Sequence, residues 1–361
     1  MTKLEQLAEA GQSVWYDYIQ RSLMDSGKFQ MLINSGLRGV TSNPAIFKKA
    51  ITGSTDYDAA LERAARETDD ANAHYEAVVL DDIGRAADLF RPVYDRTDGL
   101  DGYVSIEVNP LLAYDTKKTI EEAIRLFNQL KRPNIMVKVP ATPEGMPAIR
   151  ELIQLGININ VTLIFGLDQY IQVANAFIDG LEQFHQQKGD VSKVASVASF
   201  FVSRVDTAVD KQLAAKGIDD LQGKIAVANS KVAYEKSLEI FDTSGWKKLA
   251  KEGARMQRLL WASTGTKNPE YSDTLYVDEL IGPNTVNTMP PATLDAFIDH
   301  GSIVRTIDKN VTQAYKDLEN LKAHDIDLDA ITSQLLSDGV DLFKEAFVDL
   351  VNAIEQKAAE L

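Results

Sequence analysis

The chain has 361 residues and a formal net charge of −15, and this acidic balance argues against nucleic acid as a partner, because a phosphate backbone needs a basic face. It contains no cysteine, which excludes disulfides, thiolate catalysis and zinc–sulfur sites and fits a reducing cytoplasm. No run of about 18 apolar residues occurs, so we expect a soluble, cytoplasmic protein that does not span a membrane.

Apolar stretches of strand length alternate with helical sequence along the chain. A short helix is expected at 2–11, and further helical sequence follows at 21–36, 45–97, 116–131, 143–156, 169–186, about 205–240 and from Pro290 onward. Eight strands are predicted: Ser13–Ile19, Gly39–Ser42, Tyr103–Glu107, Ile135–Val139, Ile159–Ile164, Val194–Ser199, Arg258–Ala262 and Thr285–Thr288. No glycine- or serine-rich linker divides them, so we expect one domain over residues 1–361.

A regular series of eight strands, each followed by helical sequence, predicts a closed (β/α)₈ TIM barrel with additional N- and C-terminal helices. A doubly wound sheet usually has fewer strands and a glycine-rich phosphate loop, and no such motif is present. The C-terminal helical extension covers about 305–361. Its candidate core positions are Leu335, Phe343, Phe347, Leu350 and Ile354.

Lys138 is the one charge in an otherwise apolar strand that ends at Pro140. An unpaired ammonium in a buried strand is costly, so either the amine finds partners or it is held neutral. A neutral, desolvated lysine is a nucleophile toward carbonyls. The alternative interpretation is an edge strand whose lysine side chain reaches out to water.

Polar residues at the carboxyl ends of barrel strands usually form the site. Those of this chain are Asp17, Thr41–Asn43, Glu107, Lys138, Asn160 with Thr162, Ser199 with Arg204, Ser263 with Lys267, and Thr288. A lone strand-end acid is more often a surface residue, and Thr-Ser-Asn before Pro44 is also a routine helix N-cap. As a set, however, they supply an amine, two carboxylates and several neutral hydrogen-bonding groups, as a Schiff-base enzyme acting on a polyol requires.

Metal-based and histidine-based chemistry are poorly supported, and we expect neither a metal site nor a cofactor. The four histidines are scattered through amphipathic helical stretches or their ends, and none lies in a strand-end motif. They are His74, His185, His300 and His324.

Five segments together resemble the transaldolase family: TSNP, SIEVNP, VKVPATPEG, GININVTLIF and SFFVSRVD. The resemblance covers nearly the whole chain in the right order. It implies a class I, Schiff-base (β/α)₈ transferase of the non-oxidative pentose phosphate pathway. Such an enzyme moves a dihydroxyacetone unit from sedoheptulose 7-phosphate or fructose 6-phosphate to an aldose phosphate, either glyceraldehyde 3-phosphate or erythrose 4-phosphate.

By this resemblance Lys138 is the Schiff-base lysine and Asp17 is the general acid/base for carbon–carbon cleavage. Glu107 and Thr162 are the pair that handles water during imine formation. The substrate-binding positions are Asn43, Asn160 and Ser199 for the dihydroxyacetone moiety and Arg204 for phosphate, with Ser263 and Lys267 completing the phosphate site. We also expect Asp17 and Glu107 to relay protons without clamping the lysine amine in a salt bridge.

The sequence departs from the family pattern in the loop after RLLWAS. This loop carries Thr-Gly-Thr-Lys, where the family pattern leads us to expect a shorter segment leading to an arginine. The chain also resembles the longer bacterial transaldolases rather than the compact ones. Two other functions stay open: a simple class I aldolase that releases free dihydroxyacetone, and a non-catalytic sugar-phosphate-binding barrel. A binder has no use for a buried lysine, which disfavours the second. We expect a monomer or a homodimer.

Overall fold

The computed structural model describes all 361 residues, and its centre is a closed barrel of eight parallel strands. The strands are β1 (Gln12–Tyr16), β2 (Gly39–Val40), β3 (Tyr103–Glu107), β4 (Ile135–Pro140), β5 (Ile159–Ile164), β6 (Ser196–Phe201), β7 (Arg258–Ala262) and β8 (Thr285–Met289). Each strand pairs with the next, and β8 pairs with β1 to close the barrel. The predicted (β/α)₈ barrel is therefore confirmed.

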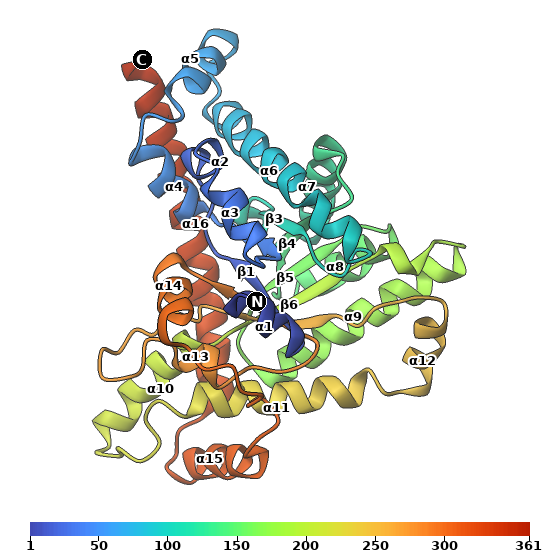
Figure 1. The fold of residues 1–361 in the computed structure, drawn as a ribbon, viewed down its shortest axis with the longest axis vertical. Helices are drawn as coiled ribbons and strands as arrows, with labels where there is room; N and C mark the ends of the chain where they lie inside the picture. Colours follow the sequence, from blue (N-terminus) through green and yellow to red (C-terminus); the bar gives the residue numbers. More distant parts are fainter.

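Helices surround the barrel (Figure 1). Those between strands are α2 (Arg21–Asp25), α3 (Lys28–Asn34), α4 (Pro44–Thr52), α5 (Asp58–Glu67), α6 (Ala71–Arg96), η1 (Pro110–Leu112), α7 (Thr116–Leu130), α8 (Gly145–Gln154), α9 (Leu167–Gln186), η2 (Val191–Lys193), α10 (Ser203–Ala215), α11 (Ile225–Ile240), α12 (Ser244–Lys251) and α13 (Leu275–Asp278). The terminal helices are α1 (Lys3–Glu9), α14 (Pro291–His300), α15 (Val311–Ala323) and α16 (Leu328–Glu360). None of these helices combines the length and the apolar character that crossing a bilayer requires.

Several predicted boundaries are wrong. The expected helix at 21–36 is two helices, because Gly27 adopts a left-handed φ of 76° between them. The expected helical stretch at 45–97 is divided into α4, α5 and α6. The first strand ends at Tyr16 rather than Ile19, and β6 starts at Ser196 because the turn η2 lies before it. The expectations of a single domain and of a monomer or homodimer stay predictions.

A buried ion-pair network closes the barrel at the amino-terminal ends of its strands. The fully buried Asp101 carboxylate accepts a hydrogen bond from Ser13 Oγ at 2.8 Å and pairs with Arg258 at 2.9 Å and Arg38 at 3.2 Å. Arg258 also donates to Ser13 Oγ at 2.8 Å. Burial alone would raise the pKa of Asp101, but the Arg258 guanidinium and these hydrogen bonds hold it below its ordinary value. The charges of Asp101, Arg258 and Arg38 at this end of the barrel are thus paired with one another.

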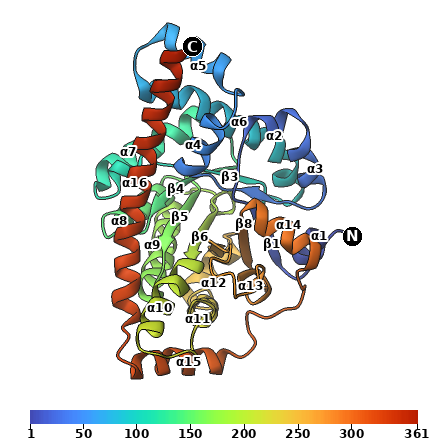
Figure 2. The same cartoon turned by 90° about the vertical axis from the view of Figure 1, so that its left-hand side faces the viewer.

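The terminal helices α1 and α16 lie on opposite sides of the barrel (Figure 2). Helix α1 packs on β1, whereas α16 contacts β5 and η1 at the carboxyl ends of the strands. Among the expected core positions of α16, Phe347, Leu350 and Ile354 are buried. Leu335 and Phe343 are only half-buried, and Phe343 faces a cavity at the barrel mouth.

Removing Arg258 leaves the buried Asp101 carboxylate without its main partner. We expect Arg258→Ala to lower the free energy of unfolding by about 3–5 kcal/mol, the usual scale for breaking a buried ion pair. The surface pair Arg255–Asp98, whose carboxylate side chain is 87% exposed, offers a matched control. Arg255→Ala should change stability by less than about 1 kcal/mol. Urea denaturation measures both variants, and similar losses would contradict the role given to Asp101.

Candidate active site

Strand register places the central polar residues side by side. Glu107 on β3 is paired with Lys138 on β4, and Lys138 is paired with Asn160 on β5. Successive side chains of a barrel strand alternate between the interior and the exterior, and these three project into the barrel. They are 8%, 5% and 0% exposed, respectively.

The Lys138 amine has partners on two sides. Its Nζ lies 3.0 Å from Oε1 of Glu107 and donates a hydrogen bond to the carbonyl oxygen of Ser42 at 2.9 Å. The expectation that Glu107 leaves this amine free of a salt bridge is therefore wrong, whereas Asp17 does not pair with it. Register puts Glu107 directly beside Lys138, and a buried ammonium requires a counter-charge. The edge-strand interpretation is also wrong, because Lys138 lies inside a closed barrel.

Glu107 and Thr162 carry buried oxygens that are open to further partners. Apart from the Lys138 amine, the Glu107 oxygens have no protein partner, and Thr162 Oγ1 has none. Burial raises the pKa of Glu107, and the Lys138 ammonium opposes this rise. Buried polar atoms are normally hydrogen-bonded, so these oxygens are suited to contact a small molecule within the barrel.

Asp17 reaches the same cavity from β1, although it lies one residue beyond the end of that strand. Its Oδ1 accepts a hydrogen bond from Thr41 Oγ1 at 2.7 Å, and Thr41 Oγ1 lies 2.6 Å from Thr288 Oγ1. Burial raises the pKa of Asp17, while the Lys138 ammonium and the Thr41 hydroxyl oppose the rise. A carboxyl group with a raised pKa can both take and return a proton closer to neutral pH.

Neutral hydrogen-bonding groups complete the interior of the site. Asn160 Nδ2 donates to Ser105 Oγ at 3.0 Å, and Ser199 Oγ donates to Asn160 Oδ1 at 2.6 Å. Asn43 is the N-cap of α4, and its Oδ1 accepts from the Ile46 N–H at 3.0 Å. The N-cap interpretation of this segment is therefore correct, and it still leaves the Asn43 side chain on the cavity wall.

Two cations without ion-pair partners stand at the rim of the cavity. The Arg204 guanidinium lies over the ring of Phe201, 5.3 Å from its centroid. Burial lowers the pKa of Arg204, and Asp17 opposes this change. Lys267 lies on the loop after β7, where Ser263 holds a left-handed φ of 55°. Unpaired cations beside one cavity of an acidic protein favour an anionic ligand there.

Eight of the ten residues predicted to be catalytic or substrate-binding line one cavity of about 230 Å³. The predicted positions on its wall are Asp17, Asn43, Lys138, Thr162, Ser199, Arg204, Ser263 and Lys267. Glu107 borders an adjoining apolar crevice, and Asn160 lies behind Ser199. Sequence reasoning missed Ser105, although its place two residues before Glu107 puts it on the same face of β3. It also treated Phe343 only as a core residue.

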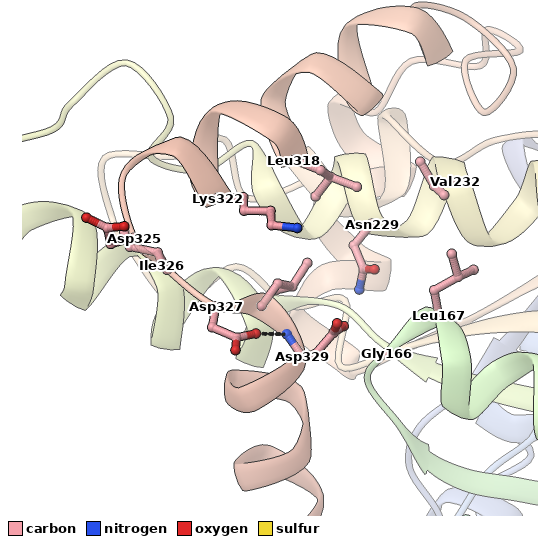
Figure 3. Close-up of a pocket in the computed structure, with 11 residues that line it drawn as sticks. Gly166, Leu167, Asn229, Val232, Leu318, Lys322, Asp325, Ile326, Asp327 and Asp329 are labelled. Carbon is pink, nitrogen blue, oxygen red and sulfur yellow. Dashed lines mark hydrogen bonds between the residues drawn. The ribbon is translucent and has the colours of Figure 1, made fainter.

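A larger cavity of about 600 Å³ lies beyond the end of β5, between α9, α11, α15 and the start of α16 (Figure 3). Its charged side chains are Lys322, Asp325, Asp327 and Asp329, and all of them are exposed. None of the predicted site residues lines it. The structure holds no cluster of three or more histidine or carboxylate side chains suited to a metal ion. We therefore assign the candidate site to the barrel mouth, where the charged side chains of Lys138 and Glu107 are buried.

Replacing Lys138 by methionine would leave the Glu107 carboxylate without its cation. The pKa of Glu107 should then rise further, so that the folded variant keeps this group protonated where the unfolded chain ionises it. Stability that depends on the protonated form is present at low pH and is lost as the pH rises through the raised pKa. We expect Lys138→Met to be destabilised by roughly 3 kcal/mol at pH 8 and by less at pH 5.

The double variant Lys138→Met/Glu107→Gln is the control for this experiment, because it has no carboxyl group to titrate at position 107. Urea denaturation at both pH values measures the difference. An equal pH effect in the two variants would assign it to another group.

Comparisons with a family model and with individual known proteins identify the same family over nearly the whole chain. The family model described as Transaldolase/Fructose-6-phosphate aldolase matches residues 14–354. The transaldolase of Trichodesmium erythraeum is 46% identical, covering 99% of this chain and 98% of that protein. The transaldolases of Mycolicibacterium smegmatis (46% identical, 98% and 96% covered) and Thiobacillus denitrificans (45%, 98% and 100%) are similar over the same length. The chain therefore belongs to the transaldolase/fructose-6-phosphate aldolase family.

Proposed function

We propose that this chain is a cytoplasmic transaldolase of the non-oxidative pentose phosphate pathway. It removes a dihydroxyacetone unit from sedoheptulose 7-phosphate or fructose 6-phosphate and transfers it to glyceraldehyde 3-phosphate or erythrose 4-phosphate. The observation that carries the proposal is the buried Lys138–Glu107 pair at 3.0 Å, beside a cavity that also holds Asp17 and Arg204. An amine, two carboxyl groups and unpaired cations are the groups that Schiff-base chemistry on a sugar phosphate uses.

The ion pair supports a route for activating the amine. Lys138 must lose a proton before its nitrogen attacks the C2 carbonyl, and Glu107 is close enough to accept that proton. Attack gives a carbinolamine, whose hydroxyl group takes the proton back and leaves as water, forming the iminium. Thr162 Oγ1, which is buried without a protein partner, is suited to hold this water.

Carbon–carbon cleavage follows from the iminium, which withdraws electrons from the C3–C4 bond. Asp17 takes the proton of the C4 hydroxyl group, the bond breaks and the aldose phosphate leaves. The three-carbon enamine stays attached to Lys138 until an acceptor aldehyde arrives and the same steps run in reverse. The hydrogen bond from Thr41 at 2.7 Å holds Asp17 in place for both directions. In this mechanism the hydroxyl groups of the three-carbon unit are held by Asn43 and Ser199, and by Asn160 through Ser199, whose Oγ donates to Asn160 Oδ1 at 2.6 Å.

The phosphate group of the substrate would bind at the rim of the cavity. Arg204 offers two parallel N–H donors, and Lys267 and Ser263 lie on the same cavity wall. A fructose 6-phosphate aldolase is the alternative, because it would use the same residues and differ only in the fate of the enamine. The full-length similarity to proteins named transaldolase favours transfer.

Borohydride reduces an iminium to a stable amine and so marks the nucleophile. With fructose 6-phosphate, Lys138→Ala should abolish both turnover and labelling. Asp17→Asn should still be labelled, while cleavage slows by roughly two to four orders of magnitude, the usual scale of acid–base catalysis. Lys231→Ala is the matched control, because Lys231 is also buried and lies 3.0 Å from a glutamate, Glu279. Turnover of Lys138→Ala with labelling at another lysine would overturn the assignment.

Arg204 should act on phosphorylated substrates alone. We expect Arg204→Ala to raise KM for fructose 6-phosphate by roughly 10- to 100-fold, because hydrogen bonds to charged groups contribute about 1.5–3 kcal/mol. The rate with unphosphorylated fructose should hardly change. Arg150→Ala on the exposed side of α8 controls for the change in net charge. Steady-state kinetics with fructose 6-phosphate and with fructose measures both effects. An equal loss of activity on the two ketoses would assign Arg204 a structural role.

A further inference from the structure

Phe343 on α16 brings a side chain from outside the barrel to the reactive amine. Lys138 Nζ lies 5.9 Å from the centroid of the Phe343 ring. The ring borders the cavity that contains Asp17 and Lys138, and it also borders the apolar crevice of Glu107 and Thr162. Phe343 therefore forms part of the wall around the Lys138 amine and around the proposed water-handling pair, Glu107 and Thr162.

The position of this ring depends on the close docking of α16 against β5. Gly339 precedes Phe343 by one helical turn and lies on the same face of α16. A Cβ atom at Gly339 would come within 3.0 Å of Leu163 Cδ2. Leu163 itself directly follows Thr162 and holds a left-handed φ of 61° at an irregularity in β5. The helix backbone thus lies as near to the end of β5 as a side chain permits.

Both ends of α16 are held against the rest of the molecule. Near its beginning, Ile331 and Thr332 are buried and the helix contacts α10. Lys48 pairs with Asp349 at 2.7 Å, and Lys357 pairs with Asp58 at 2.8 Å. Figure 2 shows the helix running along one side of the molecule between these attachments. Phe343 lies between these two attached ends. The part of the cavity wall that its ring forms is therefore fixed in position.

The enamine formed by cleavage can react in two ways. It can attack an acceptor aldehyde, which is transfer. Alternatively, C3 takes up a proton, and water hydrolyses the resulting iminium to free dihydroxyacetone and the Lys138 amine. The second route needs an acid at C3 and then a water molecule, and an apolar ring over the site restricts the access of water.

We propose that Phe343 determines reaction specificity by shielding the enamine on Lys138, so that transfer is favoured over release of dihydroxyacetone. This inference rests on the proposed function. It assigns a role in the reaction to a residue of the C-terminal extension, which contributes none of the groups that move protons.

The test measures free dihydroxyacetone released for each three-carbon unit transferred from fructose 6-phosphate to erythrose 4-phosphate. We expect Phe343→Ala to raise this ratio roughly tenfold, a change of about 1.4 kcal/mol between the two barriers. Labelling of Lys138 by borohydride should persist. Phe343→Leu retains an apolar wall and should raise the ratio less. Gly339→Ala displaces α16 from Leu163 and should raise it as well.

Leu350→Ala is the control for a loosened helix, because Leu350 is fully buried on α16 and lies outside the active-site cavity. It should lower stability without altering the ratio. An unchanged ratio in a folded Phe343→Ala variant would overturn this inference, and so would an equal rise in Leu350→Ala. The proposed function is tested separately, by borohydride labelling of Lys138 in the unaltered protein. If the unaltered protein is not labelled, the proposed function is overturned together with this inference.

Discussion

The rest of the candidate site depends on one buried ion pair, formed by the Lys138 ammonium and the Glu107 carboxylate. The pair exists because parallel register aligns Glu107 with Lys138, and because burial makes each charge depend on the other. Apolar residues of similar volume would stabilise the barrel at least as well as such a pair does. Its place in the core is therefore better explained by the proposed mechanism, in which the proton that leaves the Lys138 nitrogen has an acceptor 3.0 Å away.

Stability and reactivity are divided between the two ends of the barrel. At the amino-terminal end, Asp101 is surrounded by Ser13 and Arg258, and every charge has a partner. At the carboxyl end, Thr162 Oγ1 is buried without a protein partner, and the buried Glu107 carboxylate has only the Lys138 amine. A rigid base allows the mouth to keep polar groups that would otherwise cost the fold stability.

Local sequence patterns were sufficient for most of the fold and for part of the site. The strands Tyr103–Glu107, Ile159–Ile164 and Arg258–Ala262 were predicted to the residue, because each is an apolar run between clear turn signals. The Lys138–Glu107 pair was not predicted, since it depends on the register of two strands that are separated by α7. No local pattern connects Phe343 to Lys138 either, because α16 meets the barrel mouth only through the tertiary fold.

The course of α16 also has a consequence for how the protein is made. Its salt bridge from Asp349 reaches Lys48, 301 positions earlier in the chain. Contacts of such sequence separation form late, because a long loop must close before they contribute. During synthesis the barrel strands that carry Lys138 and Glu107 emerge before α16 does. In the proposed mechanism, the nascent chain therefore carries its nucleophile before α16 completes the wall of the cavity, and the proposed selectivity arises only when this final helix docks.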